Sequence, residues 1–81
     1  MKPKVFSITL ELNAQSHKDG QFTVPKEVCE LLGVGNGDEI EVEIKGQKIL
    51  TKLASGTEVY GSEFTPLIKA GERIRISINL P

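Results

Sequence analysis

Residues 20–44, GQFTVPKEVCELLGVGNGDEIEVEI, constrain the fold most, because they hold the signals for a strand, a short helix and a second strand in close succession. Pro25 fixes its φ near the helical value and lacks an N–H that the first helical turn leaves unbonded, so it predicts a helix start. An apolar stripe at i, i+3 and i+4 runs through residues 28–32, and Gly33 can supply a left-handed helix cap. Residues 39–44, EIEVEI, then alternate as a strand does, with three glutamates on the outer face.

The flanking segments predict further strands. Residues 5–12, VFSITLEL, alternate apolar and polar positions, and the polar residues 13–20 close on Asp-Gly as a loop. Residues 22–24 form a short strand before the helix. Residues 45–48, KGQK, suit a hairpin connection, and residues 49–53 continue as a strand.

The same order of signals returns in the second half of the chain. When the two halves are aligned with Gly56 at the position of Gly20, residues 63–68 match residues 27–32. If two residues are then allowed as a deletion, residues 71–78, GERIRISI, match residues 37–44, GDEIEVEI. This agreement predicts an internal repeat. Two positions depart from it: Glu58 stands where Phe22 stood, and Pro66 lies inside the second helix, which should therefore be a single distorted turn.

Each predicted half is a strand-strand-helix-strand unit that cannot bury its apolar face alone. A chain of 81 residues is one domain and buries only about two thirds of the surface exposed by its unfolded form. Two halves that face each other can close a six-stranded barrel and so remove exposed strand edges. The expected fold is mainly β with short helices: one barrel domain over residues 1–81, with halves at about 4–46 and 47–81.

Composition narrows the functional classes. Ten Lys and Arg against eleven Asp and Glu give a formal charge of −1, so a nucleic-acid partner would have to meet a local basic patch. The single Cys29 cannot form an internal disulfide, and no second cysteine stands near it to bind a metal. Apolar runs are too short for a membrane span or a signal peptide. A cytoplasmic protein is expected.

The letters GQFTVPKEV at residues 20–28, LGV at 32–34 and GDEI at 37–40 are similar to the pattern of the AbrB/MazE/SpoVT swapped-hairpin family. The resemblance covers about half of the chain, residues 8–53. It implies a DNA-binding transcription regulator or antitoxin of bacteria or archaea, in which two short chains intertwine into one barrel. The duplicated pattern suggests that one chain supplies both halves, as in the related cradle-loop barrels, so either a monomeric barrel or a homodimer is expected.

The resemblance also implies where DNA would be bound. Candidate phosphate contacts are the cations near the family motif and their counterparts in the second half: Lys4, Lys18, Lys26, Arg73 and Arg75. Gln21 stands where the family usually has arginine, and Cys29 and Glu30 replace helix arginines of some members, which removes a main source of affinity and readout. The chain stops at Pro81 directly after its last strand, without the tail that binds a toxin in antitoxins, so a toxin partner is possible but less expected than DNA.

Catalytic and cofactor chemistry is not expected. His17, Ser16 and Asp19 lie in one polar loop, which lacks the rigid positioning that catalysis requires. The glycines of residues 33–37 follow a helix rather than a strand, so they suit a cap and turn and not a phosphate-binding loop. No metal, cofactor or enzymatic activity is predicted. The alternative to DNA binding is a non-enzymatic barrel used for protein interaction or assembly, which the charge of −1 and the missing arginines favour.

Overall fold

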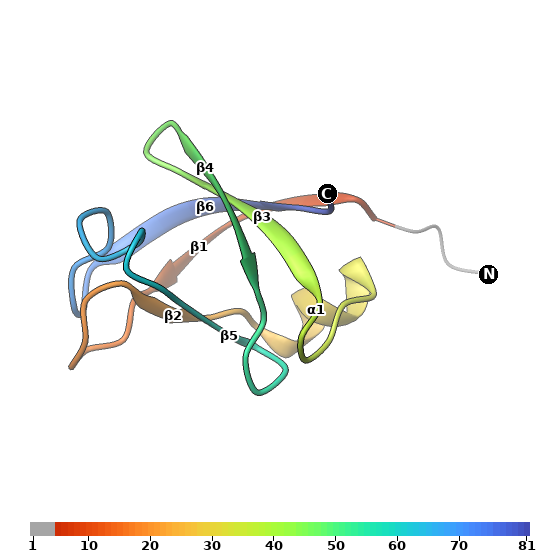
Figure 1. The fold of residues 1–81 in the computed structure, drawn as a ribbon, viewed down its shortest axis with the longest axis horizontal. Coiled ribbons are helices and arrows are strands. Elements are labelled where there is room, and N and C mark those ends of the chain that lie inside the picture. Colours follow the sequence, from red (N-terminus) through yellow and green to blue (C-terminus); the bar gives the residue numbers. More distant parts are fainter. Residues whose placement is uncertain (1–4) are drawn as a thin grey trace.

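The computed structural model describes residues 5–81, which form a mainly β domain with one short helix (Figure 1). The elements follow the chain as β1 (Ser7–Asn13), β2 (Gln21–Thr23), α1 (Lys26–Leu32), β3 (Glu39–Ile44), β4 (Gln47–Lys52), β5 (Glu58–Tyr60) and β6 (Arg73–Asn79).

The strands form two antiparallel sheets. The larger has the order β1-β6-β3-β4, and the smaller pairs β2 with β5. Between the sheets, the N–H of Gln15 donates to the carbonyl of Gln21, and Ala54 forms an isolated bridge with Glu58. Among residues 5–81 the ladders do not close into one barrel, so the closed barrel expected from the sequence stays a prediction while the mainly β class is confirmed.

The signals at the ends of α1 act as the sequence predicted. Pro25 precedes the helix with φ −56° and ψ 141°, and Gly33 ends it in the left-handed region at φ 71°. The second predicted helix is reduced to a turn at residues 62–67. The N–H of Ile68 donates to the carbonyl of Phe64 at 2.8 Å, so Pro66 lies in a single helical turn as expected.

The strand pairings keep their pattern when the two halves of the chain are exchanged. All four ladders join a strand of one half to a strand of the other: exchange of the halves turns β1–β6 into β4–β3 and maps β2–β5 and β3–β6 each onto itself. Loop hydrogen bonds follow the same exchange: Ala14 N–H donates to Glu72 O at 2.7 Å, and Leu53 N–H donates to Asp38 O at 3.0 Å. In β5 the correspondence between the two halves is shifted by one residue from the alignment that the sequence suggested. Val59, not Glu58, takes the buried place opposite Phe22.

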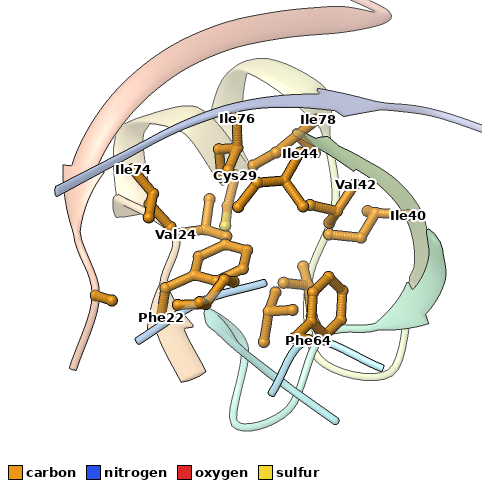
Figure 2. Close-up of a cluster of buried hydrophobic side chains, with 14 of the residues drawn as sticks. Phe22, Val24, Cys29, Ile40, Val42, Ile44, Phe64, Ile74, Ile76 and Ile78 are labelled. Atoms are coloured by element: carbon orange, nitrogen blue, oxygen red, sulfur yellow. The ribbon is translucent and has the colours of Figure 1, made fainter. Parts of the chain in front are cut away.

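The core lies between the two sheets and is closed by α1 and by the turn at residues 62–67 (Figure 2). Alternate residues of β3 and β6 are buried: Ile40, Val42, Ile44, Ile74, Ile76 and Ile78. The rings of Phe22 and Phe64, one from each half, meet edge to face with centroids 6.1 Å apart. The glutamates of β3 lie on the opposite face of the sheet, which confirms the inward and outward sides predicted from the alternation.

The loop between β1 and β2 is held against the segment that leads into β6. The carboxylate of Asp19 accepts a hydrogen bond from the N–H of Ala70 at 2.6 Å, and the N–H of Gly20 donates to the carbonyl of Ile68 at 2.8 Å. Gly20 has φ 79°, and a Cβ at this position would lie only 2.9 Å from the backbone nitrogen of Thr65. A glycine is therefore required both by the conformation and by the close approach.

Candidate nucleic-acid interface

The four predicted phosphate contacts that lie within the described residues do not form one patch. Lys4 lies outside the described residues. Lys18 belongs to the loop before β2, whereas Lys26 is the first residue of α1, after β2. The strand separates them, and Figure 1 places α1 at the opposite end of β2 from that loop.

Arg73 and Arg75 share the outer face of β6, and an acid stands beside them. The Nε of Arg73 lies 3.1 Å from Oε1 of Glu11 on β1. Arg75 is the direct cross-strand partner of the same Glu11. Both arginines are exposed, but one carboxylate is placed to offset part of their charge.

The rest of this sheet face is also close to charge balance. In the β3–β4 ladder, Glu39 stands opposite Lys52 and Glu43 opposite Lys48. The amide of Asn79 on β6 donates to Glu41 at 3.2 Å. A sheet face without a net positive charge does not attract phosphates, so the arginines of β6 are poorly placed to bind DNA there.

Lys18 has a different setting, because it lines a pocket. The pocket has a volume of about 210 Å³ and lies between the β1–β2 loop and the segment after β5; it is lined by Lys18, Asp19, Gly20, Tyr60, Gly61, Ser62 and Thr65. The ammonium of Lys18 sits 5.8 Å from the centre of the Tyr60 ring, in the range of a cation–π contact. Half of the Tyr60 surface, 52%, is exposed.

Lys45, by contrast, has partners for its ammonium group. The Nζ of Lys45 donates to the carbonyl of Leu67 at 2.7 Å and lies 3.4 Å from Glu72. The carboxylate of Glu72 also accepts the N–H of Lys69 at 3.1 Å. This backbone hydrogen bond, with a smaller contribution from Lys45, holds the pKa of Glu72 below its ordinary value.

Gln21, the residue that replaces the family arginine, faces the second half of the chain. Its Nε2 donates to Oε2 of Glu58 at 2.9 Å across the β2–β5 pair. This side chain supports the contact between the two halves and carries no charge for a phosphate.

Sequence reasoning missed Tyr60, Ser62 and Thr65, because the pocket arises from contacts between segments about 40 residues apart. The one local signal was the Asp-Gly pair at residues 19–20, which marked a turn but not what packs against it.

Cys29 is the single cysteine of the chain, and it is buried. The thiol of Cys29 points into the core (Figure 2), where burial raises its pKa. This part of the chain contains no cluster of three or more His, Cys, Asp or Glu side chains able to hold a metal ion. It also contains no helix with the length and apolar character needed to cross a bilayer.

Comparison of the chain with protein-family models, with curated proteins and with solved structures gave no match.

Proposed function

We propose that this chain is a DNA-binding transcription regulator of the AbrB/SpoVT swapped-hairpin type, in which one chain supplies both halves of the barrel and works in the cytoplasm. The observation that carries the proposal is the exchange of strand pairings between the halves. Every ladder takes one strand from each half; exchange of the halves turns β1–β6 into β4–β3 and maps β2–β5 and β3–β6 each onto itself. The family builds its barrel from two interleaved copies, and a duplicated chain would give this arrangement within itself.

The local motifs support the same proposal. Pro25 opens the helix and Gly33 closes it in the left-handed conformation, so the Pro-x-Glu and Leu-Gly signals serve the roles that the family pattern implies. The N–H of Gly35 donates to the carboxylate of Asp38 at 2.7 Å, which fixes the Gly-Asp turn before β3. These contacts support the fold assignment; the DNA-binding role rests on the resemblance and on the exposed Lys18 and Lys26.

Fluorescence anisotropy with a labelled duplex from the region upstream of the chain's own gene tests the proposal. At about 50 mM salt we expect binding that weakens steeply as salt rises, because each phosphate contact contributes about 0.9 to the slope of log K against log salt. Lys26→Gln should reduce this slope, and Lys48→Gln, which removes an equal charge beside Glu43 on the outer sheet face, should leave it unchanged. Absence of salt-sensitive binding to any duplex would refute the proposal.

A non-enzymatic barrel for protein interaction or assembly is the second candidate. The ion pair of Arg73 with Glu11 favours it, because that pair leaves less free charge for a phosphate. Recovery of one stoichiometric protein partner from a nuclease-treated extract, with no nucleic acid, would support this alternative. Light scattering would separate a monomeric barrel from an intertwined homodimer under either candidate.

A further inference from the structure

We infer that the pocket between residues 18–20 and 60–65 holds a backbone phosphate of DNA; this inference rests on the proposed function. Its volume of about 210 Å³ falls below the range of about 300–1,000 Å³ usual for pockets that take drug-sized ligands. The pocket therefore suits a single small group and not a whole nucleotide.

The pocket carries the kinds of donor that bind phosphate oxygens. They are the ammonium of Lys18 and the hydroxyls of Ser62 and Thr65. Within the described part of the chain, the Lys18 ammonium makes no ion pair, and the two hydroxyls have no side-chain hydrogen bond. All three donors are thus available to an incoming anion.

The neighbouring acid is held by the protein backbone. The Oδ1 of Asp19 accepts the N–H of Ala70 at 2.6 Å, so this carboxylate is tied to the segment before β6 and leaves Lys18 unpaired. Its negative charge still opposes a phosphate, which provides a test. Asp19→Asn keeps the oxygen that accepts from Ala70 and removes only the charge.

The walls of the pocket are fixed relative to each other. Gly20 lies so close to Thr65 that a Cβ at position 20 would meet the Thr65 nitrogen and hydroxyl at 2.9 Å. The ring of Tyr60 holds the Lys18 ammonium at 5.8 Å from its centre. A cation held against an aromatic ring in a pocket that two hydroxyl residues also line loses less freedom on binding than a lysine on an open surface.

Salt-dependent DNA binding by pocket variants, each checked for its fold by circular dichroism, tests the inference. Lys18→Gln should weaken binding and lower the salt slope by about 0.9. Ser62→Ala and Thr65→Val remove hydroxyls but no charge, and each should weaken binding by about three- to tenfold without changing the slope. Asp19→Asn should tighten binding by about two- to fivefold.

Two matched variants control for general effects. Lys48→Gln removes a lysine from the outer sheet face, and Ser16→Ala removes an exposed hydroxyl from the same loop outside the pocket lining. Neither should change the affinity or the slope.

Two outcomes overturn the inference, and they can be told apart. If the wild-type protein binds DNA but Ser62→Ala and Thr65→Val bind as tightly as it does, the pocket is not the phosphate site, while the proposed function stands. If about 10 mM inorganic phosphate shifts the amide resonances of residues 60–65 but no duplex binds, the ligand is a free phosphate compound. The assignment of the bound phosphate to DNA and the proposed function are then both wrong.

Discussion

Replacement of Gly20 by alanine is expected to destabilise the fold strongly, because two effects add at this position. Gly20 has φ 79°, and a left-handed conformation costs an L-residue about 1–2 kcal/mol. The new Cβ would lie 2.9 Å from the nitrogen and 3.0 Å from the Cα of Thr65, and such overpacking costs about 1–3 kcal/mol. Lower entropy of the unfolded alanine chain offsets about 0.4–1 kcal/mol.

The net loss in the free energy of unfolding should therefore be about 1–4.6 kcal/mol, with a midpoint of about 3 kcal/mol, against the roughly 4–12 kcal/mol expected for a chain of this length. Gly46→Ala is the matched control. Gly46 has φ 81° in the β3–β4 hairpin, and a Cβ there meets nothing within 4 Å. The control carries the conformational cost without the clash, so it should lose at least about 1 kcal/mol less than Gly20→Ala.

Urea unfolding followed by circular dichroism measures both variants. Adding Thr65→Ala to Gly20→Ala should recover little stability, because two of the three short contacts are with the Thr65 backbone. Equal losses for Gly20→Ala and Gly46→Ala would refute the close packing of the β1–β2 loop against residues 62–67, and with it the rigid pocket.

Three further predictions follow from the core and from the titrating groups. Phe64→Ala removes a fully buried ring in edge-to-face contact with Phe22 and should cost about 3–5 kcal/mol in the same urea assay. The pKa of Glu72 is lowered in the folded state, first by the N–H of Lys69, so its contribution to stability is present above the ordinary pKa of about 4.3 and is lost as the pH falls through the folded value. Glu72→Gln should accordingly lose less stability than the wild type between about pH 5 and pH 3, and an identical acid profile would contradict this assignment. Burial raises the pKa of Cys29, so its thiol should react with iodoacetamide at about pH 8 far more slowly in the native protein than in urea.

Sequence-based predictions were most accurate for elements that have a strong local signal, such as a buried face or a residue that starts or ends a helix. The alternation of residues 39–44 assigned the inner and outer faces of β3, because one face of that strand is fully buried. Pro25 and Gly33 located the ends of α1 through backbone preferences that do not depend on distant parts of the chain. Pro66 likewise indicated that the second helix would shrink to one turn.

The arrangement of the strands into two sheets and the neighbours of the charged side chains could not be predicted from local signals, because both depend on contacts between distant segments. β2 and β5 are only three residues long, so their short ladder does not join the four-stranded sheet. The pairing of Arg73 with Glu11 depends on a register between residues 62 positions apart. The alignment of residues 71–78 with 37–44 sets the arginines under the outward glutamates but gives no information about their neighbour.

The position of β6 has a consequence for the order in which this chain can fold. β6 is the last strand of the described chain, yet it lies inside the larger sheet, between β1 and β3. Until residues 73–79 leave the ribosome, β1 has no partner in that sheet, and the backbone edges of β1 and β3 that pair with β6 lack their hydrogen-bond partners. Ordering of the larger sheet must then wait for contacts that span almost the whole chain, such as Ser7 with Asn79. Such distant pairings slow folding, so this small domain should fold in milliseconds to seconds, as all-β domains do, and not in the microseconds of helical bundles.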